Sequence, residues 1–236
     1  MKIVKVFRFV VANFVIALFV GALIYFGFSS KTISVSGENT PIYKGSASDK
    51  VSLMINVYWG TEYLDEMLKC LADNEVKTTF FVGGSWVRDN EEAFMKIVDA
   101  GHEIGNHGFF HKDHSKISYD NSVEEISATH NLVKSLCGKE MTLFAPPSGA
   151  YNKNALLAAS KLGYASIMWS KDTIDWRDQD ERIIIKRATK NISGGDLILM
   201  HPTPATAKSL GEIILKIKES NLRVAPVSEV IYPVKA

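Results

Sequence analysis

The sequence has little cysteine and almost no excess charge, and each shortage excludes a class of protein. Only Cys70 and Cys137 occur among 236 residues, which excludes a small fold held together by several disulfides. We interpret both as small buried apolar side chains rather than as a disulfide pair. The formal net charge is +1, so the composition gives no sign of nucleic-acid binding. Internal repeats and low-complexity blocks are also absent from the sequence.

One long apolar run lies near the N-terminus. Residues 9–28 carry no charge, and at 1.5 Å per residue they would span about 30 Å, the thickness of one bilayer core. Lys2, Lys5 and Arg8 precede the run, so the positive-inside rule keeps residues 1–8 in the cytoplasm. We expect a single-pass transmembrane anchor with the remaining chain outside the cytoplasm. A cleaved signal peptide is the main alternative, and a buried core helix is the weakest one.

The anchor is followed by a predicted linker and one folded domain. Residues 29–49 are rich in Ser, Thr, Gly and Asn and have no sustained periodicity, which is typical of a linker. From residue 50 to residue 236, short β-rich runs alternate with helical patterns, which predicts parallel strands joined by helices in an α/β layer or barrel. The predicted strands are 51–57, 78–82, 102–106, 142–144, 165–169, 196–200 and 223–225. The predicted helices are 62–74, 91–100, 122–136, 153–162, 182–191 and 207–220.

Polar and aromatic residues gather directly after the predicted strands. In α/β folds the sites form at the carboxyl ends of the strands, so this position indicates a common site. His107 and His111 are the strongest pair, because imidazole is a frequent metal ligand and residues four apart can converge on one ion. The segments concerned are 56–59, 107–111, 146–147, 172–176 and 201.

Several segments in a fixed order resemble the polysaccharide deacetylases, the NodB-homology carbohydrate esterases. The resemblance covers residues 50–232. Asn-Val-Tyr-Trp-Gly and Phe-Ala-Pro-Pro-Ser-Gly are further similar to the subgroup found in spore-forming bacteria, which would link the chain to sporulation or to envelope modification. The segments that carry the family resemblance are Thr78–Gly83, Gly101–Gly105, Asn106–His111, Phe144–Gly149, Trp169–Trp176 and Leu199–His201.

The resemblance implies a distorted (β/α) barrel that removes N-acetyl groups from cell-wall polysaccharide with the help of a divalent metal, expected to be zinc. His107 and His111 would bind the metal. His201 would be the general acid, and Asp175 would orient it. The backbone N–H of Ser148 would hold the oxyanion. The other residues expected to contact the glycan are Pro147, Tyr151, Trp176, Trp59 and Tyr58.

The first motif departs from the family pattern. The family has Thr-Phe-Asp-Asp-Gly where this chain has Met-Ile-Asn56-Val57-Tyr58. Asn56 therefore stands at the position of the general base and Val57 at the position of a metal ligand, and neither side chain can do that work. Ala145 replaces the Arg that pairs with the base, so the base and its partner are lost together.

Three functions follow from this pattern. The first is an active deacetylase with a replacement ligand from Glu62, Asp65 or Asp113. The second is a catalytically inactive relative that binds glycan, and the third is a structural module of an envelope or spore assembly. We expect a monomer at the outer side of the cell membrane whose partner is an N-acetylglucosamine-containing polysaccharide, either peptidoglycan or a related glycan.

The remaining polar residues have simpler interpretations. His102 is expected to be structural, whereas His114 and His130 are expected to be solvated. Ser122 and Glu125 have the spacing of a capping box, which would begin a helix at this point.

Overall fold

The computed structural model describes residues 40–232. The predicted cytoplasmic segment and the predicted anchor (9–28) lie outside the described residues. None of the helices within residues 40–232 combines the length and the apolar composition that a membrane span requires.

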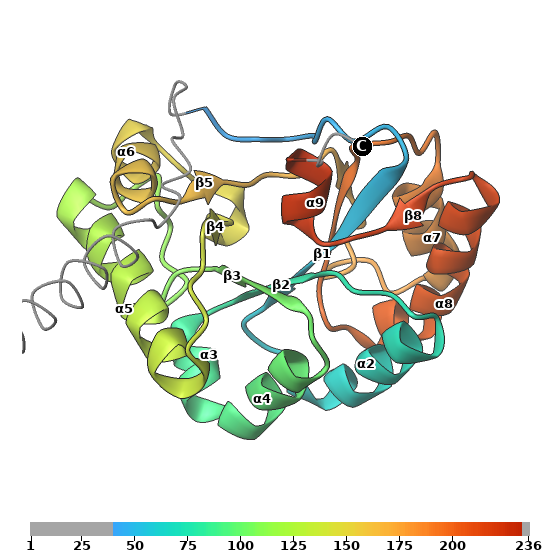
Figure 1. Cartoon of the computed structure of the whole chain (residues 1–236), viewed down its shortest axis with the longest axis horizontal. Helices are drawn as coiled ribbons and strands as arrows, with labels where there is room; N and C mark the ends of the chain where they lie inside the picture. The colour runs from blue at the N-terminus through green and yellow to red at the C-terminus, as the bar shows by residue number, and fades with distance from the viewer. Residues whose placement is uncertain (1–39, 233–236) are drawn as a thin grey trace, which may run out of the picture. The chain divides into compact units, whose positions relative to one another are not determined.

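Parallel strands form one curled sheet at the centre of the domain (Figure 1). The order across the sheet is β5-β4-β3-β2-β1-β7-β6, and β8 pairs with β1. The two end strands, β5 and β6, do not pair with each other, so the sheet is an open half-barrel rather than a closed barrel. The strands are β1 (Lys50–Val57), β2 (Thr79–Val82), β3 (Glu103–Asn106), β4 (Leu143–Phe144), β5 (Ala165–Ser166), β6 (Lys171–Asp172), β7 (Leu197–Met200) and β8 (Arg223–Val224).

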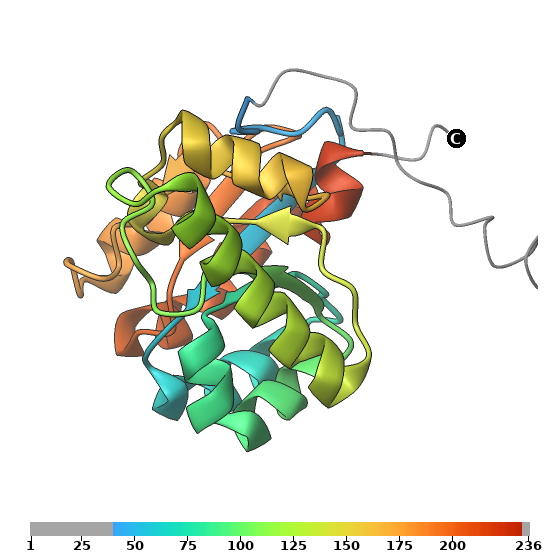
Figure 2. The same ribbon diagram turned by 90° about the vertical axis from the view of Figure 1, so that its left-hand side faces the viewer.

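Helices cover the outer face of the curl, as Figures 1 and 2 show. Ser118 begins the longest of them, because its hydroxyl accepts a hydrogen bond from the N–H of Asn121. The structure adds α3 and α9, which the sequence pattern does not predict. The helices are α2 (Leu64–Asp73), α3 (Gly84–Asp89), α4 (Glu91–Asp99), α5 (Tyr119–Cys137), α6 (Lys153–Lys161), α7 (Glu181–Thr189), α8 (Pro204–Glu219) and α9 (Val227–Ile231), with short 3-10 turns at Thr61–Tyr63 and Pro147–Gly149.

The alternation along β1 divides the core into two parts. Leu53, Ile55 and Val57 are buried in the large cluster between the sheet and the outer helices, whereas Met54 belongs to a smaller cluster inside the curl. Because side chains alternate along a strand, Asn56 lies on the same inner face as Met54. The strand thus turns Asn56 inward and buries Val57 on the helix side.

The described part of the predicted linker packs onto the domain. The backbone N–H of Ile42 donates to Ser166, and the N–H of Ala47 donates to the carbonyl of Val230 in α9. Residues 40–49 therefore run as a strap across the open side of the curl (Figure 1). The folded domain begins before residue 50, because these hydrogen bonds fix the strap.

Three sequence-based expectations about single residues can be compared with the structure. His102 is structural as expected, since it is buried and its Nδ1 accepts a hydrogen bond from the N–H of Thr78. The expectation for His114 is wrong, because this side chain is fully buried and its Nδ1 lies 3.2 Å from the hydroxyl of Ser122. Cys70 and Cys137 are free thiols rather than a disulfide pair, as expected, but both are only partly buried.

Candidate active site with a degenerate first motif

A cavity of about 500 Å³ lies where the strands of the sheet end. Its lining residues are the last residues of several strands and the residues that follow strands, which is the usual position of a site in an α/β fold. Aromatic rings and imidazoles dominate its surface, and a single formally charged residue, Asp172, lines it. The lining residues are Asn56, Tyr58, Trp59, His107, His111, Ser148, Trp169, Asp172, Trp176, Leu199 and His201.

His107 and His111 lie together on the loop that follows β3. Their ring centroids are 5.0 Å apart. Nδ1 of His107 lies 2.7 Å from the carbonyl oxygen of Ala145, so Nδ1 carries the proton and Nε2 is left as an acceptor. Burial lowers the pKa of His107 to about 3, with a smaller contribution from His111. Both features favour a neutral imidazole, the form that binds a metal ion.

Glu125 anchors the loop that carries His107 and His111. Its buried carboxylate accepts hydrogen bonds from the N–H groups of Phe109 (2.9 Å) and Phe110 (2.7 Å), and it pairs with Lys112 at 3.0 Å. The predicted capping box is therefore wrong, because α5 begins one turn earlier and places Glu125 on its buried face. A charged residue at an apolar position of that helix is the sequence signal that could have identified it.

Asp175, in the segment after β6, and His201, directly after β7, form a second hydrogen-bonded unit. Asp175 is fully buried, and its Oδ1 lies 2.8 Å from Nδ1 of His201. Its Oδ2 accepts hydrogen bonds from the backbone N–H of His201 and from the hydroxyl of Thr206, both at 2.6 Å. The carboxylate thus orients the imidazole and also ties the β7 end to the first turn of α8 (Pro204–Glu219).

Two aromatic rings pack against the imidazoles of the cavity, one stacked and one tilted. Trp59 lies parallel to His201, with the centroids 5.7 Å apart and the planes at 9°. Tyr58 lies 4.8 Å from the ring of His111. Gly60 makes this turn possible, because it has φ of +79° and a Cβ there would lie 2.0 Å from the carbonyl oxygen of Pro202.

The three residues that depart from the family pattern make few polar contacts. Asn56 is 4% exposed, and its Oδ1 has no hydrogen-bond partner among the described residues. Val57 packs in the helix-facing core, and Ala145 packs in the core inside the curl. Nothing on this wall can take up a proton at neutral pH, since an amide and two aliphatic side chains are not bases.

A divalent metal does not fit the residues present. Among residues 40–232 no group of three His, Cys, Asp or Glu side chains is arranged to hold a metal ion, and two neutral imidazoles alone lack the third ligand and the charge of a typical site. The possible replacement ligands lie elsewhere. Asp65 pairs with Lys96, Asp113 pairs with Lys116, and Glu62 lies in the Thr61–Tyr63 turn outside the cavity lining.

The structure brings most of the predicted glycan-contacting residues to the cavity, but not all of them. Tyr58, Trp59, Ser148 and Trp176 line it. Ser148 lies in the left-handed region with φ of 54°, a strained backbone conformation that is common at functional sites. Pro147 and Tyr151 are not among the lining residues. The hydroxyl of Tyr151 instead lies 2.8 Å from that of Tyr43 in the strap. Asp172 lines the cavity and belongs to one of the segments expected at the strand ends, whereas the sequence gives no such expectation for Trp169 and Leu199, which also line it.

Comparison with protein families gives one matching model, described as polysaccharide deacetylase, over residues 44–167. The Bacillus subtilis protein YlxY, described as uncharacterized, is 40% identical over 192 residues, which are 81% of this chain and 60% of that protein. The chain thus spans less than two thirds of that relative. The Bacillus subtilis peptidoglycan-N-acetylmuramic acid deacetylase PdaA is 26% identical over 80% of this chain and 74% of its own length.

Solved structures with the same fold include one relative of particular interest. A CE4 family pseudoenzyme from Bacillus anthracis is 35% identical and superposes with a TM-score of 0.80, covering 83% of this chain and 70% of that chain. A mutant of the same pseudoenzyme, described as having restored enzymatic activity, is 33% identical with a TM-score of 0.80, covering 83% of this chain and 72% of that chain.

Proposed function

The chain belongs to the polysaccharide deacetylase family, and from this membership we propose that it is a catalytically inactive member that binds N-acetylglucosamine-containing cell-wall polysaccharide. The observation that carries the proposal is the composition of the cavity. It keeps the aromatic rings and imidazoles that can contact a sugar, while Asn56 and Val57 stand where the base and a metal ligand would be. Similarity to a pseudoenzyme and to peptidoglycan deacetylases supports the same function.

The aromatic rings are suited to a sugar. Trp59 and Trp176 are exposed at 44% and 56% of their surface, although both line a cavity. Amphipathic rings of this kind offer a flat apolar face to the C–H groups of a pyranose and lose little conformational entropy on binding. Stacking on His201 holds the Trp59 ring in place before a ligand arrives.

The location that we propose is the outer side of the cell membrane. The basic residues before the apolar segment 9–28 support it, since they favour retention of the N-terminus in the cytoplasm. A cell-wall glycan would then be within reach of the domain.

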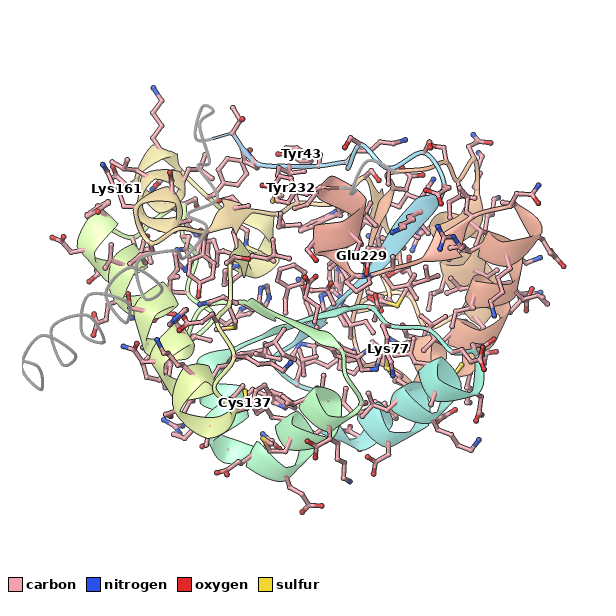
Figure 3. All side chains as sticks on the ribbon, viewed as in Figure 1. Tyr43, Lys77, Cys137, Lys161, Glu229 and Tyr232 are labelled. Carbon is pink, nitrogen blue, oxygen red and sulfur yellow. The ribbon has the colours of Figure 1, made fainter. Side chains whose placement is uncertain are left out.

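Titration of the full-length protein with N-acetylglucosamine tetrasaccharide tests the proposal, with acetate release followed in the same samples with and without zinc. We expect binding without acetate release, and roughly tenfold weaker binding by the Trp59→Ala variant. Tyr43→Ala is the matched control, because Tyr43 is equally exposed (46%) but lies on the strap away from the cavity lining (Figure 3).

The outcomes separate the three functions. Zinc-dependent acetate release by the wild-type protein would establish an active hydrolase and contradict the proposal. Absence of both binding and acetate release would leave the structural module. Equal loss of affinity in the Trp59 and Tyr43 variants would show that the cavity is not the binding site.

A further inference from the structure

A second hollow of about 580 Å³ lies beside the cavity and is rich in basic residues. It is built by β6 (Lys171–Asp172) and by the solvent-facing side of α7 (Glu181–Thr189). The chain as a whole is nearly neutral, so four cationic side chains in one hollow are a local concentration of charge. We call it the basic groove and define it by Ser170, Lys171, Ile183, Lys186, Arg187 and Lys190.

Two of the four cations serve the fold. The Lys171 ammonium donates a hydrogen bond to the carbonyl oxygen of Lys190 at 2.7 Å, which satisfies the C-terminal end of α7. Arg187 donates to the carbonyl oxygen of Thr173 and pairs with Asp178 at 2.7 Å. Both cations are therefore fixed in position and add to the field in the groove.

The nearby acids do not neutralise the groove. Asp178 is shared between Arg187 and Arg177. Asp196 lies 3.9 Å from Lys171 and is closer to Lys44, at 3.2 Å. Asp178 and Asp196 are thus each shared with a cation outside the groove, and Asp172 is the one acid among the lining residues that the structure describes.

Lys186 and Lys190 complete the charge distribution. Within residues 40–232 neither ammonium has an acidic partner, and both side chains are exposed. Lysines at the C-terminal end of a helix also interact favourably with its dipole, but that role needs neither a hollow nor two fixed cations beside them.

The groove and the cavity meet at Asp172, which lines both. Oδ1 of Asp172 accepts a hydrogen bond from the N–H of Ile174, so this boundary is fixed. On the groove side Ile183 is 40% exposed and supplies an apolar floor. The cavity and the groove are therefore adjoining hollows, as a polysaccharide with successive sugars in the two would require.

We infer that the basic groove binds the carboxylate of an acidic sugar that adjoins the sugar held in the cavity. This inference rests on the proposed function and refines it, because it selects a glycan that alternates neutral and acidic amino sugars over a uniformly neutral one. The lactyl group of N-acetylmuramic acid carries a carboxylate of this kind. Ammonium groups bind a carboxylate through charge-assisted hydrogen bonds, and the negative Asp172 keeps the acidic group on the lysine side.

Two tetrasaccharides of equal length test the inference on the full-length protein. One is made of N-acetylglucosamine only, and the other alternates N-acetylglucosamine with N-acetylmuramic acid. The wild-type protein should bind the acidic ligand more tightly, and the difference should shrink as salt is added. The double variant Lys186→Glu, Lys190→Glu should lower the affinity for the acidic ligand by about tenfold and leave the affinity for the neutral ligand unchanged.

The matched control reverses two other lysines that are exposed and unpaired within the described part of the chain. Lys153→Glu, Lys161→Glu changes the net charge by the same amount on α6 (Lys153–Lys161), which lies at the opposite end of the sheet from α7 (Figure 1). This control should leave the affinity for both ligands at the wild-type value. An equal loss of acidic-ligand affinity in the two double variants would overturn the inference, because it would show an effect of net charge alone.

Two further outcomes are decisive. Equal affinity of the wild-type protein for the two tetrasaccharides, unaffected by Lys186→Glu, Lys190→Glu, would overturn the inference and leave the proposed function standing. Binding of neither tetrasaccharide would overturn the proposed function itself. Thermal unfolding of each variant, expected at the wild-type temperature, shows that the surface substitutions leave the fold intact.

Discussion

The two walls of the cavity have kept different kinds of residue. On the wall formed by the segments after β6 and β7, Asp175 and His201 match the residues that the family resemblance implies and form a hydrogen-bonded unit. On the wall after β1, Asn56 and Val57 have replaced two carboxylates. The walls differ in one physical respect, which is how much backbone structure each side chain supports.

Asp175 is tied to the fold by its hydrogen bonds. It accepts from a backbone N–H, an imidazole and a hydroxyl, so its loss would leave several buried donors unpaired. Asn56 makes no such bond through Oδ1. We infer that the residues kept on this wall are those that stabilise the fold in addition to any role in catalysis. The presence of His201 and Asp175 alone is therefore weak support for catalysis.

The largest effect is expected from restoring the missing family residues on the wall after β1. The triple variant Asn56→Asp, Val57→Asp, Ala145→Arg restores the base, its partner and a third metal ligand at once. Acetate release from N-acetylglucosamine oligomers with zinc should rise to about ten thousand times the background rate seen with the wild-type protein, since a positioned base and a metal ion each contribute about two orders of magnitude.

The double variant Asn56→Asp, Ala145→Arg is the control for that experiment. It rebuilds the base without the metal ligand and should release little acetate. Val57 packs on the helix side of the sheet in the present structure. It is the last residue of β1, so zinc binding in the triple variant can favour a backbone rotation at residue 57 that turns the new aspartate side chain toward the cavity. A triple variant that binds no zinc, by metal analysis of the purified protein, would show that the backbone of this wall has diverged as well.

A smaller effect is expected from removing the hydrogen bonds of Asp175 on the other wall. Asp175→Ala should lower the free energy of unfolding by about 3 kcal/mol or more, because it leaves buried donors of His201 and Thr206 unpaired. Urea unfolding measures the change. Asn56→Leu is the matched replacement on the other wall, and it should be neutral or stabilising by up to about 1 kcal/mol, since it removes an unpaired buried oxygen. Equal losses of unfolding free energy in the two variants would contradict the inference that the two walls differ in how strongly their side chains stabilise the fold.

Much of the fold could be predicted from the sequence, because hydrophobic periodicity is a local signal. The pattern predicts β1 and α4 to within a residue or so at either end. It does not predict α3, a short helix that begins with Gly84 and depends on close packing, since a Cβ at Gly84 would lie 2.3 Å from Phe109. The open edge of the sheet and its strap also depend on long-range pairing, which no local pattern contains.

The candidate site could be predicted wherever a motif carried it. Ordered motifs identify His107, His111 and His201, and the structure brings all three to one cavity. Tyr151 shows the limit, because its hydroxyl bonds to Tyr43, 108 residues away in the sequence. Trp169 was missed for a related reason, since it was counted within an apolar strand although the strand ends at Ser166.

The smallest effect concerns a histidine whose role is structural only. Burial, and to a lesser degree Lys77, lowers the pKa of His102 from 6.5 to about 4. The unfolded chain therefore binds a proton at a higher pH than the folded chain does. The stability that depends on neutral His102 is complete above about pH 6.5 and falls as the pH drops toward about pH 4.

His102→Gln should remove this part of the pH dependence. Glutamine can still accept the hydrogen bond from the N–H of Thr78, but it does not titrate. Between about pH 7 and about pH 4.5, the variant should lose roughly 2 kcal/mol less unfolding free energy than the wild-type protein, as measured by urea unfolding. His130→Gln, at a partly exposed position, is the control. If both variants kept the wild-type dependence of unfolding free energy on pH, the fold would not hold His102 neutral. A structural role would then no longer explain this buried histidine outside the cavity.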